Sequence, residues 1–150
     1  MKRKILNLVA FVAIAAGMMM TSSCKPDEPT TAELLLGTWK LTNITEGSVS
    51  RTPAELGSTM FYFFKDDGTY SAHYTLEFYG ELYQQDENGT YTLDDKTITL
   101  TYTEDGETFV EQKVIQEIDE THMVTDETIT NDALGEIHSI RTYEKTDATI

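Results

Sequence analysis

From residue 37 onward, apolar and polar side chains alternate with a period of two, which is the pattern of half-buried β-strands. Turn residues interrupt this alternation at short intervals, and Asp66-Asp67-Gly68 gives the strongest hairpin signal. The pattern predicts eight strands, at residues 37–45, 59–65, 69–79, 89–93, 97–103, 107–118, 121–130 and 136–145. A polar loop is expected near residues 47–57, and nearly all the other connections are of hairpin length.

Sequential hairpins without helical crossovers predict an antiparallel meander. The expected fold class is therefore all-β, an eight-stranded antiparallel up-and-down barrel, because closure leaves no exposed sheet edge. A two-sheet sandwich with Greek-key connections is the alternative. One short helix is expected at residues 31–36, where a threonine can cap an apolar turn and the turn can cover one end of the barrel.

The N-terminus has the pattern of a secretory signal peptide. Three basic residues at positions 2–4 precede a run at residues 5–20 that is apolar except for Asn7. Sixteen helical residues span about 24 Å, less than the roughly 30 Å hydrocarbon core of a bilayer. Small residues follow, so removal during secretion is predicted rather than a membrane-spanning helix.

Thr21-Ser22-Ser23-Cys24 resembles the lipobox of bacterial lipoproteins, in the form common in Bacteroidetes. The resemblance implies that Cys24 receives a diacylglycerol thioether, becomes the first residue after cleavage and is then N-acylated. Each buried CH₂ contributes about 0.8 kcal/mol, so two or three acyl chains would hold the protein on a membrane. An ordinary signal peptide with an incidental cysteine is the alternative.

Residues 25–31 contain two of the three prolines and suggest an extended, charged tether. Lys25-Pro26-Asp27-Glu28 also resembles the surface-export signal of Bacteroidetes lipoproteins. The expected organisation is a signal peptide at 1–23, a lipidated cysteine and tether at 24–33, and the β-barrel domain at 34–150. The expected location is the outer membrane, with exposure on the cell surface; a periplasm-facing anchor is the alternative.

Charge and composition exclude several classes of function. The chain has 26 acidic and 11 basic residues, a net charge of -15, so it would repel nucleic acid. A single cysteine excludes a disulfide framework and a multi-cysteine zinc site. His73, His122 and His138 fall on different predicted strands, so no metal site is expected. The sequence contains no motif for nucleophilic catalysis, phosphate binding or dinucleotide binding. We therefore expect the protein to have no cofactor and not to be an enzyme.

Residues 35–41, with the sequence LLGTWKL, resemble the Gly-x-Trp opening of lipocalins. Residues 64–70, 89–91 and 98–100 resemble the lipocalin-like lipoprotein domains of Bacteroidetes. The resemblance implies that Gly37 and Trp39 form the barrel floor and that Arg141 takes the place of the family arginine that stacks across the tryptophan. The chain departs from true lipocalins in lacking their Thr-Asp-Tyr motif and C-terminal helix.

An eight-stranded barrel is just wide enough to be filled by its own side chains or to hold one small ligand. Tyrosine combines an apolar ring with a hydroxyl that needs a partner, which suits a binding pocket. Alternation places four candidate ligand-binding tyrosines on the inner face: Tyr62, Tyr74, Tyr91 and Tyr102.

Two functions remain open from the sequence. The first is a membrane-anchored lipoprotein that binds a small apolar or amphipathic ligand. The second is an accessory lipoprotein whose filled barrel presents loops to an unidentified protein partner, and an enzyme that uses the barrel mouth is a third and weaker interpretation. The interior of the barrel distinguishes the first two functions. A hollow interior lined by tyrosines favours ligand binding, and an interior filled by side chains favours the accessory role.

Replacing Cys24 with alanine tests the anchor. The variant should move from the membrane fraction to the soluble fraction, because the acyl chains have no other attachment point in the predicted scheme. Fractionation followed by immunoblotting measures the change. Unchanged membrane association of Cys24→Ala would refute lipidation at this residue.

Overall fold

The computed structural model describes residues 28–131 and 135–148. The predicted signal peptide, Cys24 and the first part of the tether lie outside these residues. Within the described ranges, no helix has the length and hydropathy needed to cross a bilayer.

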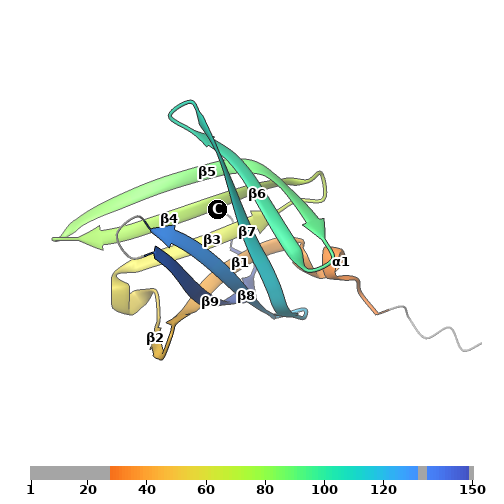
Figure 1. Ribbon diagram of the computed structural model, residues 1–150, viewed down its shortest axis with the longest axis horizontal. Helices are drawn as coiled ribbons and strands as arrows, with labels where there is room; N and C mark the ends of the chain where they lie inside the picture. The colour runs from red at the N-terminus through yellow and green to blue at the C-terminus, as the bar shows by residue number, and fades with distance from the viewer. Residues whose placement is uncertain (1–27, 132–134, 149–150) are drawn as a thin grey trace, which may run out of the picture.

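Strands make up nearly all of the described chain (Figure 1). In chain order the elements are α1 (Thr31–Leu35), β1 (Gly37–Glu46), β2 (Val49–Arg51), the 3-10 turn η1 (Ala54–Leu56), β3 (Ser58–Phe64), β4 (Thr69–Phe78), β5 (Glu81–Asp94), β6 (Thr97–Glu104), β7 (Glu107–Ile118), β8 (His122–Asn131) and β9 (Gly135–Thr146).

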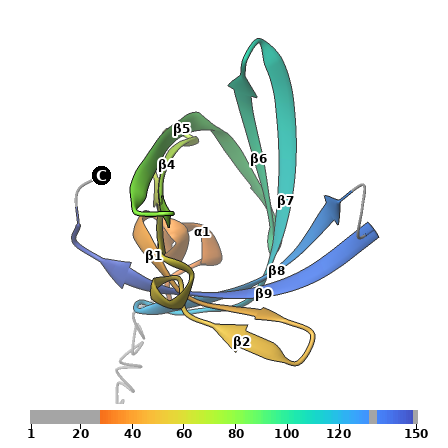
Figure 2. The same cartoon turned by 90° about the vertical axis from the view of Figure 1, so that its left-hand side faces the viewer.

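The strands close into a barrel. Each barrel strand pairs antiparallel with its neighbour in sequence, and β1 pairs with both β3 and β9. The barrel therefore contains eight strands, β1 and β3 to β9, while the short β2 pairs only with the end of β1. Figure 2 shows the ring of strands, and Figure 1 shows α1 at one end of the barrel. The predicted all-β, eight-stranded antiparallel barrel is confirmed.

Two strand segments differ from the sequence prediction. β5 begins at Glu81, so the predicted strand at 89–93 is only its second half. Residues 84–88 are Gln, Gln, Asp, Glu and Asn, which have little strand propensity, but they pair along their whole length with β4. The second difference is β2, which lies within the predicted polar loop and pairs Ile44 with Arg51.

Helix α1 closes one end of the barrel, as predicted. Thr30 caps it: the Thr30 hydroxyl accepts a hydrogen bond from the Glu33 backbone N–H, and the Glu33 carboxylate accepts one from the Thr30 backbone N–H. At its C-terminal end, the carbonyl of Leu35 accepts a 2.7 Å hydrogen bond from the indole Nε1 of Trp39. Leu35 and Trp39 are both completely buried.

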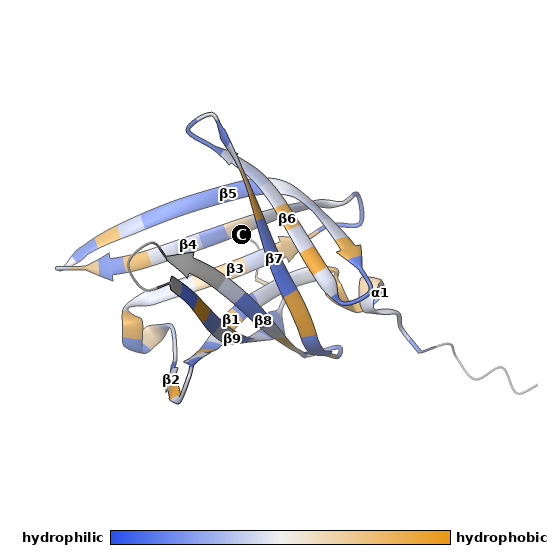
Figure 3. Ribbon diagram, viewed as in Figure 1, coloured by the Kyte–Doolittle hydropathy of each residue, from blue (hydrophilic) through white to orange (hydrophobic). Residues whose placement is uncertain are grey.

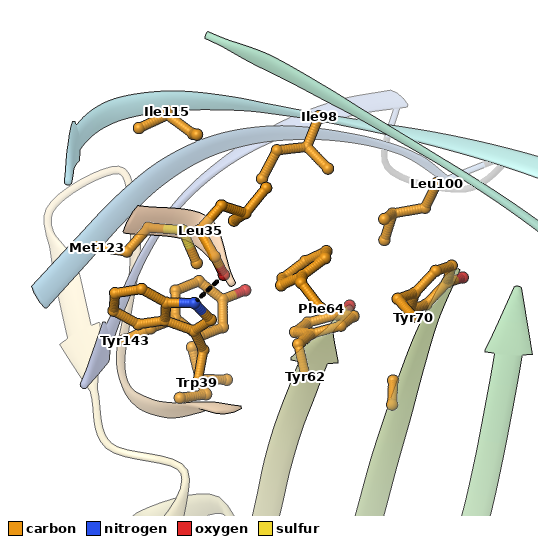
Figure 4. Close-up of a cluster of buried hydrophobic side chains, with 12 residues drawn as sticks. Leu35, Trp39, Tyr62, Phe64, Tyr70, Ile98, Leu100, Ile115, Met123 and Tyr143 are labelled. Atoms are coloured by element: carbon orange, nitrogen blue, oxygen red, sulfur yellow. Dashed lines mark hydrogen bonds between the residues drawn. The ribbon is translucent and has the colours of Figure 1, made fainter. Parts of the chain in front are cut away.

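The hydrophobic core fills the half of the barrel next to α1 (Figure 4). Aromatic rings dominate it, and the Tyr62 ring lies 5.8 to 6.2 Å from the rings of Phe64, Tyr70 and Tyr143. Aliphatic side chains cover the rings from the opposite wall, among them Ile98, Leu100, Ile115 and Met123. Burying this many large side chains supplies most of the driving force for folding.

The other half of the barrel is spread open. β5 and β6 pair only from Gly89–Tyr102 to Asp94–Thr97, and β7 and β8 begin to pair only at Lys113. In the described chain, residues 103–112 thus pair only within the β6–β7 hairpin. This hairpin projects away from both neighbouring strands (Figure 2).

Gly89 lies where β5 and β6 diverge, and the packing there leaves no room for a side chain. A Cβ at this position would overlap the carbonyl oxygen of Thr101 and would lie 2.8 Å from the Tyr70 ring. The missing side chain is therefore a packing requirement of the strand crossing.

Replacing Gly89 with alanine should destabilise the barrel by about 2 kcal/mol, because a methyl group overpacks the β5–β6 crossing. Urea unfolding followed by circular dichroism measures the change. Thr90→Ala, at the neighbouring exposed position, is the control and should unfold at nearly the wild-type urea concentration. Equal stability of the two variants would contradict the packing argument.

Candidate ligand cavity

The open half of the barrel encloses a cavity of about 760 Å³ that communicates with solvent. One wall is apolar and is formed by Leu41 and Ile44 of β1 and Met60 of β3. The opposite wall, from β4 to β7, carries tyrosines and glutamates. The volume lies within the range of about 300–1,000 Å³ that is usual for small-molecule sites.

Apolar side chains are also exposed on the β4–β5 hairpin, part of which lines the cavity. Leu76 of β4 lines the cavity and is 45% exposed. Phe78, Tyr79, Leu82 and Tyr83, on the tip of the β4–β5 hairpin, are more than half exposed. Hydrophobic positions at this tip are visible in Figure 3. The hairpin thus carries exposed apolar surface next to Leu76, since Tyr83 pairs with it.

A buried charge cluster, formed by Glu127, Lys113, Arg141, Thr125 and Tyr143, lies between the core and the cavity. The Glu127 carboxylate accepts hydrogen bonds from Lys113 Nζ at 3.0 Å, from the Tyr143 hydroxyl at 3.1 Å and from the Thr125 hydroxyl at 3.0 Å. Arg141 Nη1 lies 3.2 Å from the same carboxylate. The Glu127 side chain is only 5% exposed and that of Lys113 only 4%.

The electrostatics of this cluster favour an ionised Glu127. Burial by itself raises the pKa of the Glu127 carboxyl, but the charges of Lys113 and Arg141, together with the hydrogen bonds from Lys113 and Thr125, bring the pKa below its ordinary value. Lys113 Nζ also lies 5.1 Å from the centre of the Tyr62 ring and 3.5 Å from Glu111. Each of these charges is therefore compensated by an opposite charge, although within the described residues Arg141 Nε has no hydrogen-bond partner.

Three of the four candidate tyrosines, Tyr62, Tyr74 and Tyr102, line the cavity. The hydroxyls of Tyr62 and Tyr74 lie 3.2 Å apart, and the Tyr102 hydroxyl donates to Glu111 at 3.0 Å. Burial raises the pKa of both the Tyr62 and Tyr74 hydroxyls, so these groups stay protonated and can donate.

The fourth candidate, Tyr91, does not line the cavity, which corrects the sequence prediction. Its ring lies 5.1 Å from that of Phe64, and its hydroxyl donates to the Lys65 carbonyl at 2.7 Å. Tyr91 thus belongs to the core at the closed end. Alternation along a strand predicts which face a side chain occupies but not its height along the barrel axis.

The expected stacking of Arg141 across Trp39 is also corrected. Antiparallel pairing of β1 with β9 places Lys145 opposite Trp39 and places Arg141 opposite Ile44, farther along the barrel. Lys145 Nζ lies 5.0 Å from the centre of the Trp39 ring and donates to the Leu34 carbonyl at 2.8 Å. Trp39 does lie at the closed end of the barrel, beside Gly37, whose φ of +109° suits glycine.

The charged residues of the cavity, above all Glu127 and Lys113, were not predicted from the sequence. A signal for both was present in the alternation. Lys113 has the same phase as the apolar Ile115 on β7, and Glu127 has the same phase as Met123 on β8. Charged side chains at inward positions of a predicted barrel are candidates for a buried, functional network.

The three histidines lie apart from one another, and each faces its own carboxylates. His73 Nδ1 lies 2.6 Å from Asp86, His122 lies near Asp119 and Glu144, and His138 lies 3.7 Å from Asp126. In residues 28–131 and 135–148, no group of three such side chains is placed to hold a metal ion.

The comparisons with known proteins agree with this geometry. Residues 35–125 match the family described as the lipocalin-like domain, and because the match spans more than half of the sequence, the chain belongs to that family. No curated protein matches the sequence.

Solved structures resemble the barrel at low sequence identity. A bovine odorant-binding protein in complex with its natural ligand is 16% identical, with a TM-score of 0.52 over 81% of this chain and 77% of that chain. A bovine lipocalin allergen is 12% identical, with a TM-score of 0.52 over 81% of this chain and 79% of that chain. At such identities the likeness shows the lipocalin fold.

Replacing Glu127 with glutamine should destabilise the protein by about 3 kcal/mol at neutral pH, because two buried cations lose their counter-charge. The pKa of Glu127 is lowered in the folded state, so its contribution is complete above the ordinary carboxyl pKa of about 4.3. That contribution is lost as the pH falls through the lowered pKa, where protonated Glu127 resembles glutamine.

Urea unfolding of the wild-type protein and Glu127→Gln from about pH 7 to about pH 3 measures this difference in stability, which should shrink with acidity. Glu117→Gln, at an exposed position on β7, is the control and should change stability little at any pH. A difference for Glu127→Gln that stays constant across the pH range would contradict the role of the charge.

Proposed function

We propose that this lipocalin-like protein binds a small amphipathic molecule in its barrel and does so without catalysis. The cavity of about 760 Å³ carries the proposal, since it is open to solvent and joins an apolar wall to a wall of hydroxyls and carboxylates. Such a site suits a ligand that has both an apolar body and a polar group.

The structural neighbours support binding by analogy of fold. The bovine odorant-binding protein is described in complexes with its natural ligand and with undecanal. The alternative of a filled barrel that presents loops to a protein partner finds no support in the cavity, because the interior of the open half is hollow.

The proposal includes attachment to the outer membrane through Cys24, with the domain on the cell surface. The lipobox-like motif and the tether support this part. Residues 28–30 join the barrel at its closed end through α1, far from the β4–β5 tip (Figure 1). A lipid on Cys24 would therefore hold the closed end toward the bilayer and leave the cavity entrance facing outward.

A cavity-filling substitution tests binding. Met60→Trp should weaken binding of the neutral fluorophore N-phenyl-1-naphthylamine by about tenfold or more, because the indole would occupy ligand volume on the apolar wall. Fluorescence titration of the probe measures its affinity. Trp39 itself is an unsuitable reporter, since it lies in the core at the closed end.

Phe61→Trp is the matched control, because Phe61 neighbours Met60 on β3 and does not line the cavity. This variant should bind the probe like the wild-type protein. Circular dichroism checks that both variants are folded. A wild-type protein that shows no saturable signal with this probe or with a panel of apolar and amphipathic compounds would contradict the proposed function, as would undiminished binding by folded Met60→Trp.

A further inference from the structure

The ionisable side chains of the cavity are unbalanced in charge. Two of its lining residues are basic, Lys113 and Arg141, and four are acidic: Glu87, Glu104, Glu111 and Glu127. Four carboxylates against two cations give the lining a formal charge of −2. The whole chain, at -15, adds a field of the same sign.

Both lining cations already have partners. Lys113 and Arg141 converge on Oε2 of Glu127, at 3.0 and 3.2 Å, and Lys113 has a second carboxylate, Glu111, at 3.5 Å. An anionic ligand would compete with Glu127 for these cations and would lie close to that buried carboxylate, which repels it. The cavity is therefore poorly suited to a carboxylate or phosphate head group.

The other glutamates accept hydrogen bonds from neutral groups, and of these three only Glu111 also lies within ion-pair distance of a lining cation, Lys113. Tyr70 donates to Glu87, Gln85 donates to Glu104 at 2.8 Å, and Tyr102 donates to Glu111. Neutral donors orient these carboxylates but leave most of their charge available to a ligand.

The charges of these glutamates reach one another across the cavity wall. Burial raises the pKa of the Glu87 carboxyl. The hydrogen bond from Tyr70 and the charge of Lys113 lower it, the charges of Glu111 and Glu104 raise it, and the net direction is upward. A cation bound among the three carboxylates would relieve this repulsion. The rings of Tyr74 and Tyr102 line the same side of the cavity and add faces on which a cation can rest.

We infer that the cavity selects cationic amphiphiles, in which an ammonium group is joined to an apolar chain or ring. The ammonium group lies against Glu87, Glu104 and Glu111, and the apolar body lies against the β1–β3 wall of Leu41, Ile44 and Met60. This inference rests on the proposed function and names the chemical class of its ligand.

Three compounds of equal chain length test the inference: decylamine, decanol and decanoate. Each is titrated into the full chain at neutral pH, below its micelle concentration, and displacement of N-phenyl-1-naphthylamine gives its affinity. Decylamine should bind about tenfold more tightly than decanol, and decanoate should bind most weakly. Equal or tighter binding of decanol or decanoate overturns the inference while leaving the proposed function intact.

A charge-matched pair of variants locates the preference. The double variant Glu104→Gln/Glu111→Gln should lower decylamine affinity about tenfold and leave decanol affinity unchanged. Glu107→Gln/Glu117→Gln removes the same charge from exposed positions on β7 that do not line the cavity, and it should leave the affinities for both compounds unchanged.

An equal loss of decylamine affinity in both double variants would overturn the inference, because the preference would then come from the overall charge of the chain. If none of the three compounds displaces the probe from the wild-type protein, the proposed function fails and this inference fails with it. Decanol binding therefore distinguishes the two failures.

Discussion

The pairing of β1 with both β3 and β9 is the constraint on which the rest of the structure depends. It turns a meander of hairpins into a closed wall, so that every inward side chain meets others across a shared interior. It also determines how far along the barrel axis the residues of β1, β3 and β9 lie relative to one another. Because Trp39 is opposite Lys145 in this register, Arg141 is left free to join the charge cluster beside the cavity.

The closed wall divides into a packed half and a hollow half. Next to α1, large aromatic side chains such as Tyr62 and Phe64 fill the interior. Toward the other end, β5 and β6 separate beyond Gly89, and the β6–β7 hairpin projects outward. The separation widens the barrel where few large apolar side chains are present to fill it. The packed core and the candidate ligand cavity thus lie at different ends of the same strands.

The charge cluster around Glu127 lies at the boundary between these halves. Buried ion pairs add little net stability compared with apolar packing, because desolvation offsets much of their attraction. In this barrel the ion pairs hold Lys113 and Arg141 in place, so charged groups keep fixed positions at the inner end of the cavity. The remaining glutamates then set the sign of the charge that a ligand meets.

The sequence by itself determined most of the strand pattern, the hairpins and the capping of α1, because these depend on local turn chemistry and on a period of two. The place of Trp39 at the closed end followed from the resemblance to lipocalins, and the first half of β5 and the short β2 were not predicted. The sequence also placed Tyr62, Tyr74 and Tyr102 on the inner face. Only the tertiary structure decided that Tyr91 lies in the core and that Lys113, Glu127 and Arg141 meet. Those positions depend on the register between strands distant in sequence, and alternation within one strand carries no information about that register.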